Sequence, residues 1–257
     1  MAMPLEIVTI PCLSDNYAFL IHDPESGQTA VVDVPEATPI VAELNKRNWV
    51  LSEVWLTHHH WDHVDGLPEL LADHPATVVG AKADAHRLPK LDRAVSDDDV
   101  FSFGGEQVHI LDVSGHTIGH IALHLPETAA LFTADSLMAL GCGRLFEGTP
   151  AQMFESLQKT ASMPGNTTVY SGHEYTASNA TFAATVDPEN LALISRSQDI
   201  TDKRKKGLPT VPSSLQLERE TNPFLRAHDP AIQAHLDMAG AAPVDVFTEI
   251  RARKDRF

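Results

Sequence analysis

The chain has only two cysteines, Cys12 and Cys142, and few basic residues for its 257 positions. Two cysteines cannot build a disulfide framework, so we expect reduced thiols and a cytoplasmic location. Lysine and arginine total 19 against 35 for aspartate and glutamate, which gives a net charge of -16. Because nucleic-acid binding depends on neutralising phosphates, this charge balance argues against a nucleic-acid partner.

Long apolar runs are also missing. Residues 1–6 show no basic segment followed by an apolar stretch, and no segment approaches about 18 uncharged apolar residues. We therefore expect no secretory signal and no membrane association, and the sequence indicates no obligate protein partner. The length suffices for one large core, or for a core with a smaller appendage.

The sequence does contain a dense group of metal-ligand residue types at 57–66, directly after an apolar segment. The ligand-type side chains are His58, His60, Asp62 and His63. Alternate side chains of an extended segment share a face, so His58 and His60 can bind one metal while His59 points away. Asp62 and His63 lie past the end of the strand and face elsewhere. This stretch predicts two metals about 3.5 to 4 Å apart.

Short strands separated by turn residues dominate the first part of the chain. Strand composition is found at 5–11, 17–22, 29–34, 53–56, 77–80, 106–113, 120–125, 129–134 and 167–171. Helical patterns are found at 36–48, 67–71 and 150–163. The short spacing of the first three strands predicts antiparallel pairing. We assign no regular structure to 81–100, and we expect the three aspartates at 97–99 to form a solvated loop.

Strand signals disappear after His173. Helices are expected at 175–186, 189–205, 213–220, 229–238 and 243–253. We therefore predict an α+β protein with a first domain over 1–174 and a small α-helical domain over 175–257. The second domain is short of large aromatic residues and is expected to dock on the first.

Three further ligand candidates stand where a strand leaves the sheet: His116, Asp135 and His173. Imidazole nitrogen and carboxylate oxygen are ligands that zinc and similar ions accept. With the four residues of the first group they suffice for two metals with one bridging carboxylate and a bridging hydroxide. Zinc is favoured, although iron and manganese suit the same ligands.

Other polar residues near these turns have different expected roles. His120 begins the next strand, so we expect it to support a ligand or to be structural. Asp33 closes the third strand and is expected to hydrogen-bond a ligand histidine, with capping of a turn as the alternative.

The arrangement of these residues matches a known pattern. His-x-His-x-Asp-His at 58–63, followed by Gly-His, a strand-ending Asp and a second Gly-His, resembles the metallo-β-lactamase superfamily. Within that superfamily, four segments are similar to hydroxyacylglutathione hydrolases, also called glyoxalase II: 15–17, 141–148, 172–176 and 251–257. The resemblance covers essentially the full chain.

This resemblance implies an αββα sandwich followed by a helical domain that helps to form a glutathione site. One metal would take His58, His60 and His116, and the other Asp62, His63 and His173. Asp135 would bridge both metals. The residues expected to contact the substrate are Arg144, Phe146, His173, Tyr175, Arg251 and Lys254. Phe146 and Ala252 stand where some family members have a tyrosine and a basic residue, so we expect one hydroxyl hydrogen bond and one cationic contact to glutathione fewer than in those members.

The implied reaction is hydrolysis of S-2-hydroxyacylglutathione thioesters, with S-D-lactoylglutathione giving D-lactate and glutathione in the second step of methylglyoxal detoxification. A metal-bridging hydroxide, held with Asp62 and Asp135, would attack the thioester carbon. The leaving thiolate, whose acid has a pKa of about 8.5, needs no proton donor, and no role falls to Cys142 as a nucleophile. The alternatives are a metal-dependent phosphodiesterase, another hydrolase of the superfamily, or an inactive metal-binding module.

Overall fold

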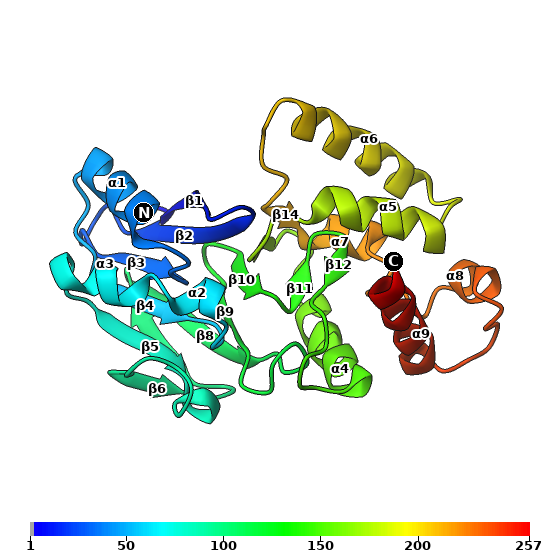
Figure 1. Ribbon diagram of the computed structural model, residues 1–257, viewed down its shortest axis with the longest axis horizontal. Helices are drawn as coiled ribbons and strands as arrows, with labels where there is room; N and C mark the ends of the chain where they lie inside the picture. Colours follow the sequence, from blue (N-terminus) through cyan, green and yellow to red (C-terminus); the bar gives the residue numbers. More distant parts are fainter. Residues whose placement is uncertain (1–2) are drawn as a thin grey trace. The chain divides into compact units, whose positions relative to one another are not determined.

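The computed structural model describes residues 3–257. The chain forms two compact units. The first comprises the described residues up to Asp112 together with Ile118–Phe132, and the second comprises Val113–Thr117 and Thr133–Phe257. Figure 1 shows the elements of both units coloured along the chain. Within residues 3–257, no helix has the length and apolar character needed to cross a membrane.

A six-stranded sheet forms one layer of the first unit. Its strands follow chain order: β1 (Glu6–Cys12), β2 (Asn16–His22), β3 (Thr29–Val32), β4 (Glu53–Leu56), β5 (Thr77–Ala81) and β6 (Arg93–Val95). The pairs β1–β2 and β2–β3 are antiparallel, as predicted, and the strands from β3 to β6 are parallel. The parallel strands bring their carboxyl ends to one edge, where polar side chains can gather.

Helices α1 (Ala37–Arg47) and α3 (Leu67–Asp73) connect the parallel strands. Both bury an apolar face, with Ile40, Leu44 and Leu70 fully enclosed. The short helix α2 (Trp61–Val64) lies between β4 and α3. The crossovers thereby fix the segment that follows β4, which holds the histidine-rich stretch.

In the first unit, the second layer is formed by the antiparallel strands β7 (Val100–Phe103), β8 (Glu106–Asp112), β9 (Ile121–Leu125) and the first three residues of β10 (Ala130–Ala134). Aromatic side chains join this layer to the six-stranded sheet. The Trp55 ring meets Phe101 and Phe103 edge-on at 5.5 and 5.1 Å, and Phe19 lies 5.6 Å from Phe132. These contacts form part of the hydrophobic core between the two sheets of a sandwich.

The second unit is mainly helical. Its elements are β11 (Leu137–Met138), β12 (Gly141–Cys142), α4 (Pro150–Ala161), β13 (Thr168–Ser171), α5 (Thr176–Val186), α6 (Leu191–Lys205), β14 (Ser213–Ser214), α7 (Leu215–Thr221), α8 (Pro230–His235) and α9 (Pro243–Arg256). Phe182, Phe224 and Phe247 anchor its core. The buried Glu218 carboxylate pairs with Arg196 and accepts a hydrogen bond from the Leu140 amide.

The α+β class and the helices after residue 174 are confirmed, but residues 213–214, expected to begin a helix, form strand β14, which pairs with β13. The segment 81–100 is more regular than expected, because it contains β6, a short 3-10 helix and the start of β7. These pieces are short and flank a charged turn, so composition alone gave little signal. The aspartates at 97–99 are exposed in that turn, as predicted. The domain boundary at 174 stays a prediction.

Candidate metal centre

The histidine-rich segment is fixed at the carboxyl edge of the six-stranded sheet. The Val34 amide donates to the His63 carbonyl at 2.8 Å, and the Gly66 amide donates to the Val34 carbonyl at 3.0 Å. A Cβ on Gly66 would lie 2.6 Å from Glu36 Cα, so only glycine permits this close approach. The loop after β4 and helix α2 are therefore tied to the chain that leaves β3.

Asp33 lies at the centre of a buried hydrogen-bond network in the same unit. Its Oδ1 accepts from the Thr57 amide at 2.9 Å, and its Oδ2 accepts from Thr57 Oγ1 and from His63 Nδ1, each at 2.8 Å. Thr57 Oγ1, whose own hydrogen is donated to Asp33, accepts a hydrogen bond from His58 Nδ1–H at 3.0 Å. The Nδ1–H groups of His58 and His63 are therefore engaged, so a metal held by either ring would bind through Nε2.

The second unit has ligand-type residues of its own. Asp135 follows β10 and His173 follows β13, while His116 lies on the loop after β8. The Nδ1–H of His116 donates to the Arg144 carbonyl at 2.7 Å. The Nε2 atoms of His116 and His173 lie 3.4 and 3.3 Å from the same oxygen, Oδ2 of Asp135. A buried carboxylate between two imidazoles has the geometry of a shared ligand.

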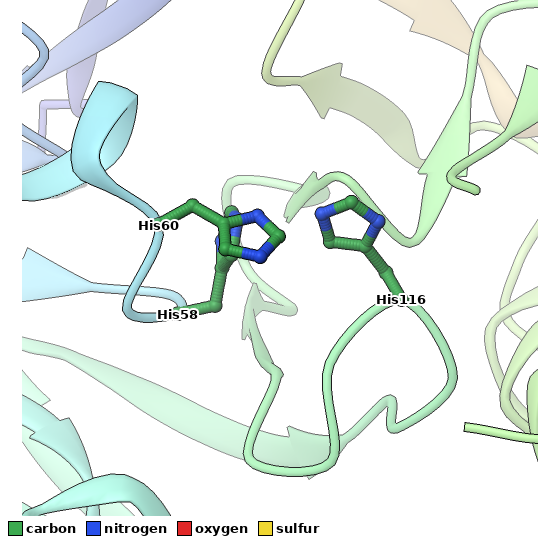
Figure 2. Close-up of side chains that lie close together, drawn as sticks. All are labelled: His58, His60 and His116. Atoms are coloured by element: carbon green, nitrogen blue, oxygen red, sulfur yellow. The ribbon is translucent and has the colours of Figure 1, made fainter. Parts of the chain in front are cut away.

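In the first unit, ligand-type atoms of Asp33, His58 and His63 lie within 4.8 Å of one another, and Oδ2 of Asp62 lies 3.9 Å from Nε2 of His63. Figure 2 shows His58 and His60 on the loop after β4, and His116 on the loop after β8. Neutral imidazoles combined with carboxylates suit zinc, iron or manganese.

Two exposed aromatic rings cover ligand candidates of the second unit. The Tyr175 ring stacks on His173 with centroids 4.6 Å apart and planes 6° apart. The Phe146 ring meets His116 edge-on at 5.3 Å. Because 40% of Tyr175 and 60% of Phe146 are exposed, both can also touch a ligand from solvent.

The predicted basic substrate contacts differ in their surroundings. Arg251 is buried, donates to the Cys142 carbonyl at 2.9 Å and pairs with Asp255 at 2.9 Å. The Arg144 side chain is 59% exposed, and its Nε lies 3.7 Å from Asp255 Oδ1. Lys254 Nζ lies 5.1 and 5.2 Å from the ring centroids of Phe182 and Phe257, and burial lowers the pKa of this lysine.

Residues left out of the predicted ligand set have other partners. His59 Nδ1 lies 3.0 Å from Oδ2 of the buried Asp84, which also pairs with Arg87, so His59 points away from the ligands as expected. His120 is buried and stacks on the His58 ring with centroids 4.6 Å apart. Burial raises the pKa of the Cys142 thiol to about 11, which makes it a poor nucleophile.

Sequence reasoning assigned no role at this centre to two residues, Thr57 and Asn16, whose side chains hydrogen-bond Asp33 and Asp62 respectively. Thr57 directly precedes His58, the first ligand candidate, and this adjacency is the sequence signal that could have indicated its supporting role. Asn16 lies in the segment 15–17 that carries the family resemblance, but it is far from the histidine group in sequence, and its hydrogen bonds to Asp62 become visible only in the folded chain.

The comparisons with known proteins agree with this geometry. Residues 15–173 match the family model for the metallo-beta-lactamase superfamily, and residues 174–257 match the model for the hydroxyacylglutathione hydrolase C-terminus. A crystal structure of ETHE1 from Myxococcus xanthus has a TM-score of 0.66 at 23% identity, covering 97% of this chain and 90% of that one. The chain is thus a metallo-β-lactamase-superfamily protein with the fold that the sequence predicted.

Relatives that align over the full chain identify the family within this superfamily. A Ruegeria pomeroyi protein named hydroxyacylglutathione hydrolase is 66% identical over 255 residues, which cover 99% of this chain and all of that protein. A Roseobacter denitrificans protein of the same name is 63% identical over the same share of both chains. The chain belongs to the hydroxyacylglutathione hydrolase family. Its superfamily and its histidine and aspartate groups indicate that it binds divalent metal ions.

Proposed function

We propose that the chain hydrolyses S-2-hydroxyacylglutathione thioesters, converting S-D-lactoylglutathione into D-lactate and glutathione as the second step of methylglyoxal detoxification. The observation that carries this proposal is the full-length similarity to hydroxyacylglutathione hydrolases in a chain with every ligand type that a two-metal hydrolase needs. We propose a cytoplasmic location, in which the free Cys12 and Cys142 stay reduced. Fractionation of expressing cells tests the location.

Two divalent ions, zinc in the first instance, are the proposed cofactors. We assign His58, His60 and His116 to one ion, Asp62, His63 and His173 to the other, and Asp135 to both. The hydrogen bonds at Nδ1 of His58, His63 and His116 support binding through Nε2. When bound, two such cations lower the pKa of a shared water and polarise a carbonyl group. Iron and manganese are the alternatives, and metal analysis of the purified protein distinguishes them.

The two proposed catalytic carboxylates act on the attacking water. Asp62 and Asp135 carry negative charge, so each can accept a hydrogen bond from the water and orient it toward the thioester carbon. The product thiolate has a conjugate acid of pKa about 8.5 and can leave unprotonated near neutral pH. Neither cysteine is needed, since both are buried.

Glutathione is the proposed partner, and its negatively charged carboxylates are expected to bind cationic side chains. Arg144 and Lys254 are the proposed direct contacts, with the rings of Phe146, Tyr175 and His173 along the thioester. Because Arg251 is buried and bound to the Cys142 carbonyl, we propose that it acts mainly by fixing segment 141–148, which bears Arg144 and Phe146.

A substrate panel tests the proposal. We expect purified protein to hydrolyse S-D-lactoylglutathione far faster than bis(p-nitrophenyl) phosphate or a β-lactam. Turnover of the phosphodiester alone would replace the thioesterase assignment with the phosphodiesterase alternative. Hydrolysis of an acyl thioester that lacks the glutathione moiety at the same kcat/KM would contradict the proposed glutathione contacts.

A further inference from the structure

Asn16 touches the histidine-rich segment from a distant part of the first unit. It opens β2, is 4% exposed, and lies 46 positions before Asp62. Its side-chain Nδ2 donates to the main-chain carbonyl of Asp62 at 3.0 Å and to Oδ2 of the Asp62 carboxylate at 3.1 Å. We infer that Asn16 is a positioning residue that sets the Asp62 carboxylate for metal binding. This inference rests on the proposed function.

The chemistry of the two bonds supports a positioning role. One amide group binds both the backbone and the side chain of the same aspartate, which restricts rotation about its side-chain torsions. The donor is neutral, so it orients the carboxylate without supplying a competing cation. The oxygen that accepts from Asn16, Oδ2 of Asp62, is also the one that lies 3.9 Å from Nε2 of His63, so the amide orients the side of the carboxylate that faces a neighbouring ligand candidate.

The hairpin that carries Asn16 is itself held in place. The Leu13 amide at its tip donates to Glu36 Oε1 at 2.6 Å. The Glu36 backbone packs against Gly66, which follows the histidine-rich segment. β2 is buried along its whole length, and Asn16 pairs with Cys12 across the hairpin. The amide is therefore presented from a rigid element, as precise orientation of a ligand requires.

Metal affinity gives a test that does not depend on turnover. Asn16→Leu is close in size to asparagine and removes the donor, and Asn16→Ala removes it with less bulk. We expect the weaker of two Zn²⁺ binding steps, titrated into metal-free protein against a chromogenic chelator, to lose about 10- to 100-fold in affinity in both variants. The tighter step should change little. With the loaded enzyme, kcat should fall more than KM rises.

Asn190→Ala is the matched control. Asn190 caps α6 by accepting a hydrogen bond from the Leu193 amide at 3.1 Å, so its loss should lower the thermal midpoint and leave both zinc affinities unchanged. Asn16→Gln retains the amide and should bind the second ion more tightly than Asn16→Leu.

The outcomes separate the inference from the proposed function. If a folded Asn16→Leu or Asn16→Ala protein binds both zinc ions with the affinities of the wild type, the role of Asn16 is overturned. The thioesterase proposal would then still stand. If Asn16→Leu fails to fold, Asn16→Ala decides. A wild-type chain that binds no divalent ion contradicts both.

Discussion

Asp33→Asn is the substitution whose effect can be worked out most fully from the structure. The side chains have nearly the same shape, but one carboxylate oxygen becomes an amide that donates. Asp33 accepts three hydrogen bonds, from the Thr57 amide, the Thr57 hydroxyl and His63 Nδ1. An asparagine can keep its oxygen toward only one side of this network, so its NH₂ group must face at least one of these donors.

The substitution is expected to change the tautomer of His63. If the new amide faces the Thr57 hydroxyl and His63, the hydroxyl can rotate to accept, but His63 must move its proton from Nδ1 to Nε2. A protonated Nε2 cannot bind a metal. Loss of such an orienting partner typically lowers metal affinity 10- to 100-fold, which corresponds to about 1.4 to 2.8 kcal/mol. A buried unsatisfied donor would add about 1 to 3 kcal/mol to the loss of folding stability.

A zinc titration of metal-free protein, paired with thermal unfolding, measures both effects. Asp84→Asn is the matched control, because Asp84 is also buried and hydrogen-bonds a histidine, His59, that we do not assign as a ligand. The control should lose stability and keep both zinc affinities to within about threefold. Equal zinc affinities in Asp33→Asn and wild type would refute the proposed role of the Asp33 network.

Two further predictions concern the second unit and the thiols. Lys254→Ala should raise KM for S-D-lactoylglutathione about tenfold, the value expected for loss of one charged hydrogen bond, and should change kcat little; a fall in kcat at constant KM would show that Lys254 does not simply hold the substrate. Burial raises the pKa of Cys12 to about 12 and that of Cys142 to about 11, so a thiol-specific chromogenic reagent should modify neither in the native protein near neutral pH and both after unfolding. Rapid native modification followed by loss of activity would contradict the inert role given to Cys142.

Much of the fold could be predicted because its elements have strong local patterns. The alternating strands β1 to β3 have clear turns between them, and α4 begins at Thr149-Pro150, where Thr149 accepts from the Gln152 amide. β6 and β7 escaped prediction because they have only three and four residues; β6 pairs with the earlier strand β5, whereas β7 forms a hairpin with β8 across Gly104-Gly105, a turn signal that went unused. Strand pairing at that length depends on tertiary packing, such as that of Phe103 against Trp55.

In the candidate site, too, some residues could be predicted from the sequence and others could not. Residue type and spacing at 58–63 predict the ligands, because such a close cluster of histidine and aspartate side chains is typical of a metal site. The partners that orient them could not be predicted as readily. Asn16 lies in segment 15–17, which carries the family resemblance, but its two hydrogen bonds to Asp62, 46 positions later, exist only in the folded chain. Arg251 on α9 has the sequence position of a substrate contact, yet its guanidinium is bound within the fold.

Chelator-sensitive turnover tests the central claim most directly. Hydrolysis of S-D-lactoylglutathione should be followed with purified protein before chelation, after removal of metal, and after zinc, iron or manganese is restored. The proposed function predicts turnover that disappears with the metal and returns when a divalent ion is added back. Turnover that persists in verified metal-free protein, or none in protein that holds two metals per chain, would contradict it.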